Sequence, residues 1–291
     1  MQLLIYLLFY PILWLISILP FRILYFFSDG VYLLVYYIIG YRKKTVRENL
    51  ALALPHLSNK ERLVIEKKFF SHLCDLFLEM IKTMTISQSE IERRYQFTNL
   101  EVYLDLEKKQ KSIALLCAHY ASYEWAVSMN YHINFTGYGI YKKINNKYFD
   151  KLVRDIRAKY KAVLITTKET TRTIQENALT GKMGVFGFAS DQTPRWSDNL
   201  HWYRYMGIET PIHVGAEILA KRYNMNVIFL KTKKIKRGYY EATFEVLSDD
   251  INTVPKHKIS EAFMSRVEQQ IYEQPEYYLW THKRWKHKKK V

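Results

Sequence analysis

The sequence predicts an α/β fold, in which a mixed, largely parallel sheet is covered by helices and preceded by an N-terminal membrane anchor and a helical segment. Three patterns predict it: an almost uncharged apolar start, helical periodicity over residues 42–110, and alternating short apolar runs and amphipathic segments over 111–291. Apolar residues make up 48% of the chain and aromatic residues 15%, which is enough to bury a core and excludes a disordered protein.

The first part, residues 1–41, is predicted to meet a membrane. Residues 3–19 are seventeen residues without a charge, about 26 Å of helix against a hydrocarbon core of ~30 Å, and we expect an uncleaved anchor. A secretory signal is disfavoured because no Lys or Arg precedes the run and no small-residue cleavage site follows it. Residues 23–41 contain Asp29 and several tyrosines, which favours an interfacial or core helix over a span. The basic residues that follow predict a cytoplasmic body: Arg42, Lys43, Lys44 and Arg47.

The second part, residues 42–110, is predicted to be helical and to pack on the third. Ser58 and Glu61 have the spacing of a capping box, and apolar residues recur after them at helical intervals for twenty residues. A second Ser-x-x-Glu, Ser87 to Glu90, predicts a shorter helix.

The third part, residues 111–291, is predicted to be the α/β domain and ends in a basic tail. The expected strands are 112–119, whose last residues are polar, 135–141, 162–166, 183–190, 226–235 and 239–247, and the expected helices are 123–131, 147–160, 168–179, 213–223 and 259–274. Between residues 191 and 211 we expect a loop of about twenty residues, which is long enough to be a functional candidate.

Polar residues follow two of the predicted strands, and ligands of open α/β sheets bind beyond the carboxyl ends of strands. His119 ends the first strand, and Asp191 with Gln192 ends another. Glu124 lies five residues after His119, a separation that would place the two side chains ~140° apart on one continuous helix. With His119 at a strand end and Glu124 in the next helix, the carboxylate can reach the imidazole and hold it as a general base for a substrate hydroxyl. A structural histidine is the alternative.

Further motifs make the chain resemble the bacterial lipid A late acyltransferases, which share an HX4(D/E) signature with glycerolipid acyltransferases. The resemblance covers nearly the whole chain. The matching residues are Arg47-Glu48-Asn49-Leu50 with Leu54-Pro55, His119 with Glu124, Tyr141-Lys142-Lys143 with Asn146, Arg157, Asp191-Gln192, Met206-Gly207, and the ending from Pro275 through Trp280 and Arg284 to Lys286.

This resemblance implies transfer of a fatty acyl chain from acyl carrier protein, or from coenzyme A, to a hydroxyl of a lipid A precursor at the cytoplasmic face of the inner membrane. It implies His119 as general base and Glu124 as its orienter. It also implies substrate contacts or site organisation by Arg157, Asp191, Gln192 and Lys142, with no cofactor and no metal. The chain departs from the family at Lys142-Lys143, where a basic-Pro pair is usual, and over 195–207, so acyl length and acceptor position stay open.

The net charge of +16 predicts anionic partners. Nucleic acid is disfavoured because no nucleic-acid-binding motif accompanies the charge. Anionic lipid and an acidic carrier protein are the expected partners, with the tail 282–290 and the run Lys231 to Arg237 as candidate surfaces, although such a run is also typical of a solvated edge strand. An acyltransferase acting on lysophosphatidate or on a mannosylated phosphatidylinositol, and a non-catalytic membrane scaffold, are the alternative functions.

Two other side-chain groups could carry chemistry. With two cysteines, a disulfide scaffold is excluded, and the apolar neighbours of Cys117 predict a buried, inert thiol. His213 and Glu217 have metal-ligand spacing on a helix, but no third ligand stands at a suitable distance in the sequence.

Overall fold

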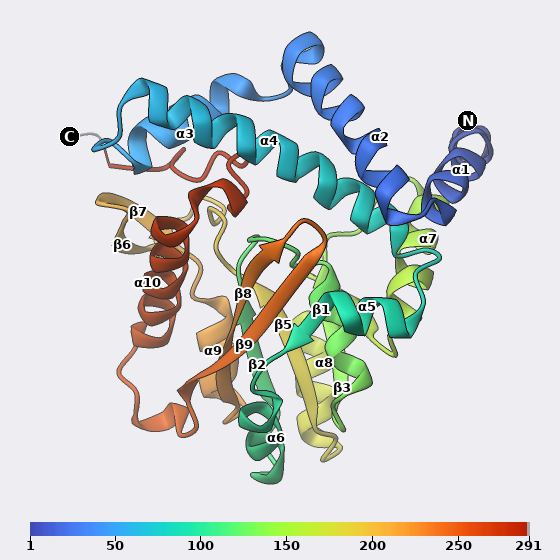
Figure 1. Ribbon diagram of the computed structural model, residues 1–291. Coiled ribbons are helices and arrows are strands. Elements are labelled where there is room, and N and C mark those ends of the chain that lie inside the picture. The colour runs from blue at the N-terminus through green and yellow to red at the C-terminus, as the bar shows by residue number, and fades with distance from the viewer. Residues whose placement is uncertain (290–291) are drawn as a thin grey trace.

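A computed structural model describes residues 1–289 and confirms the α/β fold with a mostly parallel sheet flanked by helices (Figure 1). Seven strands pair in the order β1-β9-β8-β2-β5-β3-β4, and β8 with β9 is the antiparallel pair among them. Their bounds are β1 Tyr95–Phe97, β2 Ile113–Cys117, β3 Thr136–Tyr141, β4 Val163–Thr166, β5 Gly184–Ala189, β8 Asn226–Lys236 and β9 Tyr239–Ser248. The tail predicted over 282–290 ends with Lys290, outside the described residues.

The helices form a layer over one end of the sheet and cover its faces. The N-terminal layer contains α1 Gln2–Ile18, α2 Phe21–Leu33, a π-helical turn η1 Leu34–Ile39, α3 Lys43–Ala53 and α4 Asn59–Lys82. In Figure 1 α4 crosses above the sheet, and α2 lies above α4. The remaining helices are α5 Gln88–Arg94, α6 Leu100–Lys108, η2 Trp125–Tyr131, α7 Lys147–Ala158, α8 Thr170–Leu179, α9 Gly215–Arg222, η3 Ile251–Thr253, α10 Lys258–Glu273 and η4 Pro275–Tyr277.

Local sequence chemistry explains several of these boundaries. Ser58 accepts a hydrogen bond from the Glu61 N–H while the Glu61 carboxylate accepts one from the Ser58 N–H, which confirms the predicted capping box. Ser87 caps α5 as predicted. Two expectations need correction. The predicted helix over 123–131 is a 3₁₀ helix over residues 125–131. The segment 42–110, predicted to be helical, also contains strand β1, which pairs with β9.

The loop predicted over residues 191–211 is also corrected, because its second half folds as a hairpin. Strands β6 His201–Tyr205 and β7 Ile208–Ile212 pair antiparallel. Met206 and Gly207 connect them with φ of 52° and 75°. Two successive positive φ values match the right-handed twist of a tight hairpin, and glycine adopts this conformation at little cost. The irregular segment is therefore confined to about residues 190–200.

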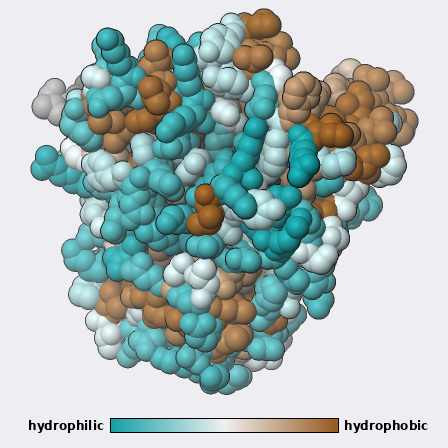
Figure 2. All heavy atoms as spheres, in the orientation of Figure 1, coloured by the Kyte–Doolittle hydropathy of each residue, from teal (hydrophilic) through white to brown (hydrophobic). Residues whose placement is uncertain are grey.

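The apolar N-terminus differs in detail from the prediction. The continuous helical segment Phe21–Ile39 is the one that is long and apolar enough to cross a membrane by length and composition, whereas Gln2–Ile18 is shorter. The sequence instead favoured residues 3–19 as the anchor and residues 23–41 as an interfacial or core helix. Apolar side chains of α1 are widely exposed, including Leu4, Leu8 and Phe9, and Figure 2 shows them as an apolar region at the corner of the molecule where Figure 1 places α1.

A buried ionic cluster attaches α2 and α4 to the sheet. Asp75 of α4 is 2% exposed and accepts hydrogen bonds from Ser28 of α2 at 2.8 Å and from Arg237, in the β8–β9 turn, at 2.9 Å. The ammonium of Lys234 lies 3.8 Å from the same carboxylate, and Arg237 also pairs with Asp29.

These contacts change the interpretation of the basic run Lys231 to Arg237. Lys234 is buried, Arg237 is paired with two aspartates, and Lys231 pairs with Glu273. Lys233 and Lys236 are the exposed lysines of the run. Two of its five charges, Lys234 and Arg237, therefore stabilise the attachment of the helical layer, and the run is not a continuous docking surface.

The cluster yields a stability prediction. Replacing the buried carboxylate by Asp75→Asn leaves Lys234 and Arg237 without their shared charge partner, and we expect the free energy of unfolding to fall by about 3 kcal/mol. Asp29→Asn is the matched control, since its carboxylate is 56% exposed and its removal should cost under about 1 kcal/mol. Denaturant unfolding in detergent micelles measures both. Equal losses for the two variants would contradict this role of Asp75.

Candidate active site

The sheet topology brings His119 and Asp191 together. Strands β2 and β5 are neighbours in parallel register, with Cys117 opposite Ala189 at their carboxyl ends. His119 and Asp191 each follow this pair by two residues. Parallel strands end at the same edge of a sheet, so two residues 72 positions apart in the chain leave that edge side by side.

Asp191 holds both the backbone and the ring of His119. Its Oδ1 accepts a hydrogen bond from the His119 N–H at 3.1 Å and lies 2.7 Å from His119 Nδ1. The Asp191 side chain is 1% exposed, while that of His119 is 20% exposed. A carboxylate at Nδ1 favours the tautomer with the proton on Nδ1, which leaves Nε2 as the acceptor nitrogen. This arrangement matches the histidine and acid of a catalytic triad.

The charges around His119 favour its protonated form. Burial alone lowers the pKa of His119, but the negative charge and hydrogen bond of Asp191, with a smaller contribution from Glu124, raise it above 6.5 overall. Burial raises the pKa of the Asp191 carboxyl. The charge and hydrogen bonds of His119 together lower this pKa by more, so that it lies below 3.8. The pair therefore stabilises an imidazolium, the state that follows proton abstraction by the ring.

The expected pairing of His119 with Glu124 is corrected by these contacts. Glu124 precedes the 3₁₀ helix η2 and points to α7, where its carboxylate forms a bidentate ion pair with Arg157. The distances are 2.8 Å from Nη2 to Oε1 and 2.6 Å from Nη2 to Oε2, with Nε at 3.2 Å. The reason is the backbone: the chain turns through Ala121, whose φ is 49°, before η2 begins, so residues 119–124 do not form the start of a helix.

The C-terminal segment braces the loop that holds His119. The Leu279 N–H donates to the His119 carbonyl at 3.1 Å, and the Ala121 N–H donates to the Tyr277 carbonyl at 2.9 Å. Tyr120 and Tyr278 form an antiparallel bridge between these contacts. The Tyr120 hydroxyl also donates to the Gln274 carbonyl at the end of α10. The loop is therefore fixed by residues about 160 positions later in the chain.

The same C-terminal segment contacts α3 and the loop after Asp191. Asn49 donates two hydrogen bonds of 2.7 Å, to the carbonyls of Trp280 and His282. The Thr193 N–H donates to His282 Nε2 at 3.2 Å. These are positioning contacts that sequence reasoning missed. The signal was present, because Asn49 and the Trp280 segment both belong to the family-like motifs, but the sequence did not show that they touch.

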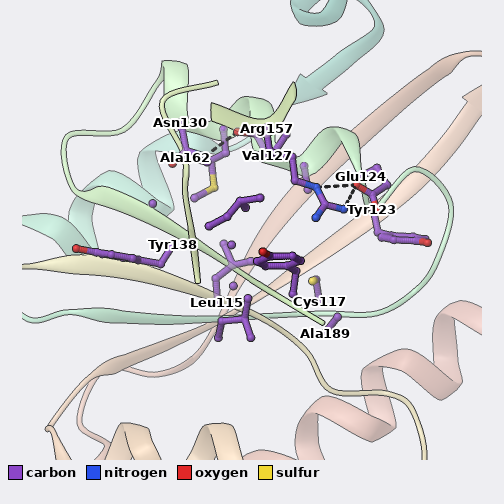
Figure 3. A pocket seen from close by; sticks show the side chains of 18 of the residues that line it. Leu115, Cys117, Tyr123, Glu124, Val127, Asn130, Tyr138, Arg157, Ala162 and Ala189 are labelled. Atoms are coloured by element: carbon purple, nitrogen blue, oxygen red, sulfur yellow. Dashed lines mark hydrogen bonds and ion pairs between the residues drawn. The ribbon is translucent and has the colours of Figure 1, made fainter. Parts of the chain in front are cut away.

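A cavity of about 470 Å³ runs from His119 along one face of the sheet, and this volume is typical of ligand sites. Its floor includes one row of register partners across four strands: Leu115, Gly187, Gly139 and Leu164. Gly187 and Gly139 leave the middle of this row without side chains, and this creates the space of the cavity. Residues of η2 and α7 cover it, including Val127, Met129 and Val153. Figure 3 shows the Glu124–Arg157 pair beside this cavity, with Leu115, Cys117 and Tyr138 lining it.

The remaining predicted site residues are placed as follows. Arg157 lines the cavity, and exposed Lys142 lies at its edge after β3. Gln192 adjoins Asp191 but lines neither of the two cavities described in residues 1–289. Cys117 also lines the cavity, and burial, with the charges of Asp191 and Glu124, raises the pKa of its thiol to about 12. A thiol with so high a pKa is a poor nucleophile near neutral pH.

Glu217, considered above as a metal ligand with His213, has a structural role. Its carboxylate accepts hydrogen bonds from the N–H groups of His257 and Ser260 at the start of α10. Within residues 1–289, no group of three His, Cys, Asp or Glu side chains is arranged to hold a metal ion.

Comparison with known proteins places this geometry in a family. The sequence profile of the bacterial lipid A biosynthesis acyltransferases matches residues 1–287. The chain belongs to this family. It is also 22% identical over 276 residues to the lipid A biosynthesis lauroyltransferase of Escherichia coli (strain K12), covering 94% of this chain and 89% of that protein. Family membership makes the chain an acyltransferase of lipid A biosynthesis, with a lipid A precursor as the substrate class.

The site yields a prediction about pH dependence. A histidine that acts as general base must be neutral to accept a proton. With His119 in the predicted role of general base, activity should fall as the pH falls through its raised pKa. Asp191→Asn removes the main charge that raises this pKa. We expect the acidic limb of kcat/KM to move to lower pH and the plateau to drop by ~10²-fold or more.

Glu124→Gln is the matched control, because Glu124 contributes less to the pKa of His119 than Asp191 does. Its acidic limb should move less than that of Asp191→Asn, whatever it does to the plateau. A larger shift for Glu124→Gln would mean that Glu124, and not Asp191, is the charge partner of the working histidine.

Proposed function

We propose that this acyltransferase moves a fatty acyl chain from the thioester of acyl carrier protein to a hydroxyl of a lipid A precursor, with His119 as general base and Asp191 as its orienting partner. The observation that carries the proposal is the His119–Asp191 contact at the head of a largely apolar cavity. The membership of the family supports the reaction class and the acceptor class. The donor and the residue roles are our inference.

The proposed step needs no group beyond the two substrates and the pair. His119 Nε2 takes the proton of the acceptor hydroxyl while the hydroxyl oxygen forms a bond to the thioester carbonyl carbon. The imidazolium is stabilised by Asp191 through Nδ1–H. The tetrahedral intermediate then releases the thiolate as the C–S bond breaks, and the imidazolium returns its proton to that sulfur. The products are an ester and a free thiol, and the histidine is neutral again.

The cavity supports a fatty acyl donor. It reaches from His119, just beyond the carboxyl end of β2, to Val185 and Gly137. Val185 on β5 pairs with Gly137 on β3 and with Ile113 on β2, six residues before His119. Six residues along a strand span about 20 Å, a length that suits an extended fatty acyl chain. In this pose the thioester lies at His119 and the chain lies over the row of Leu115 and the two glycines.

The surface beside the cavity supports an acidic donor protein. Lys142, Lys143, Lys147 and Arg154 are exposed on β3–α7, and Lys142 lines the edge of the cavity itself. These residues replace the run Lys231 to Arg237 as the proposed landing surface for acyl carrier protein. Basic residues so placed raise the encounter rate with an acidic partner, and this effect weakens as salt rises.

The N-terminal helices support action at a membrane, which we propose is the cytoplasmic face of the inner membrane, where anionic lipid would attract the basic tail. Phe21–Ile39 is long and apolar enough to cross a bilayer, and α1, which contacts α4 and α7, exposes apolar side chains. A lipid A precursor is itself held in a membrane by its acyl chains. In this proposal the helical layer holds the His119 edge of the sheet close to the membrane surface at which such an acceptor lies.

A reconstituted transfer assay tests the proposal. Wild-type protein in detergent micelles should transfer acyl chains from acyl carrier protein to a lipid A precursor, detected by mass spectrometry as one added acyl chain. His119→Ala should reduce the rate by ~10²–10⁴-fold. His56→Ala, at an exposed histidine, should leave the rate unchanged.

The same assay with other acyl donors and other acceptor lipids decides between the alternative functions. Faster transfer from the coenzyme A thioester would overturn the choice of carrier protein. Transfer to lysophosphatidate or to a phosphatidylinositol mannoside, and not to the lipid A precursor, would overturn the acceptor. Near wild-type transfer by His119→Ala would overturn the mechanism, and binding of lipid without turnover by the wild type would favour a scaffold.

A further inference from the structure

A second cavity, of about 350 Å³, opens beside the first between α1, α4 and α7. We call it the lateral groove. It is lined almost wholly by apolar side chains, and His119 is not among them. Residues that line the groove alone are Leu13 of α1, Phe77, Ile81, Thr83 and Met84 in or after α4, and Phe149, Leu152 and Ile156 of α7.

The groove faces the apolar N-terminal surface. Leu13 belongs to α1, whose side chains Leu4, Leu8, Phe9 and Leu15 are exposed. At the rim, the Phe77 side chain is 54% exposed and that of Ile144 is 37% exposed. The apolar region over α1 in Figure 2 adjoins these elements. Exposed apolar surface continuous with an apolar groove is typical of a route that hydrocarbon chains enter from a membrane.

The lateral groove and the catalytic cavity meet at the Glu124–Arg157 pair. Six residues line both: Met80, Glu124, Val127, Ile144, Val153 and Arg157. The charged pair is the polar part of this shared wall, and its side chains are only 16% and 21% exposed. A bidentate ion pair in such a place separates two apolar spaces while leaving both next to the reacting groups.

We propose that the lateral groove binds an acyl chain that the acceptor lipid already carries, entering from the membrane side of α1 and α7. This inference rests on the proposed function and names how its acceptor is held. The groove lacks His119, so a chain in it belongs to a molecule whose reacting hydroxyl lies outside the groove, across the Glu124–Arg157 wall. The donor chain, whose carbonyl must lie at His119, occupies the other cavity.

This arrangement gives the site a specificity. An acceptor with an acyl chain that reaches the groove gains apolar burial, and an acceptor without that chain presents the same hydroxyl but loses the contact. Recognition of the acyl chain of the acceptor should therefore depend on groove residues and not on residues of the donor cavity.

The kinetic test fills the groove. Leu152→Trp places a large side chain at a position that lines only the groove, and it should raise KM for the acylated acceptor by about tenfold or more, with KM for the donor within about twofold of wild type. Leu179→Trp, at a 79% exposed position near the end of α8, is the matched control and should change neither constant.

Two outcomes would overturn the proposal. A raised KM for the donor with an unchanged KM for the acceptor would assign the groove to the donor chain. An unchanged KM for both substrates would mean that neither chain occupies the groove.

A cross-linking test does not depend on turnover or on the folding of Leu152→Trp. His119→Ala is mixed with a lipid A precursor that carries a photoreactive group in an acyl chain, and cross-linked peptides are mapped by mass spectrometry. We expect cross-links to α4 and α7 around Phe77, Leu152 and Phe149. Cross-links confined to Leu115 and Leu164 in the donor cavity, or none above those of a photoreactive phospholipid, would overturn the proposal. The wild-type transfer assay is read separately, so a failure of the groove and a failure of the proposed function give different results.

Discussion

The site depends on one constraint, the adjacency of β2 and β5 in parallel register. Because Cys117 lies opposite Ala189, the residues two positions further on meet at 2.7 Å, and a buried carboxylate holds Nδ1 of a partly exposed imidazole. The rest of the architecture maintains this contact. Tyr277 and Leu279 brace the His119 loop, His282 receives a hydrogen bond from Thr193, and Asn49 ties the same C-terminal segment to the helical layer. Residues from the start, middle and end of the chain thus converge on one hydrogen bond.

The helical layer covers the edge of the sheet at which this hydrogen bond lies. It lies over the carboxyl end of the sheet, attached there by Asp75, Lys234 and Arg237, and it carries the apolar surface of α1. The two cavities meet at the wall formed by Glu124 and Arg157. In the arrangement that we propose, a donor chain over the sheet and an acceptor chain from the membrane side approach the same histidine from different directions. The net charge of +16 is divided accordingly. Part of it is buried in the attachment of the layer, and part is exposed beside the cavity.

The sequence predicted the order of strands and helices well, because each element has its own periodicity and caps. It also placed His119 and Asp191 at strand ends. It paired His119 with the wrong carboxylate, since spacing along the chain favours Glu124, whereas the pairing is decided by which strands are neighbours in the sheet. The hairpin of β6 and β7 was missed because the two strands that flank Met206-Gly207 have five residues each and no clear alternation of apolar and polar residues. The contact of Asn49 with Trp280 spans 231 residues, and no local pattern indicates it.

The most direct test of this account is the tautomer of His119. Nitrogen NMR of protein with labelled histidine, with the His119 signals assigned by their loss in His119→Gln, distinguishes a proton on Nδ1 from one on Nε2. The contact with Asp191 predicts that the neutral ring carries its proton on Nδ1, with Nε2 unprotonated and available as a base. A neutral ring protonated on Nε2 would contradict the pairing with Asp191 and the mechanism built on it.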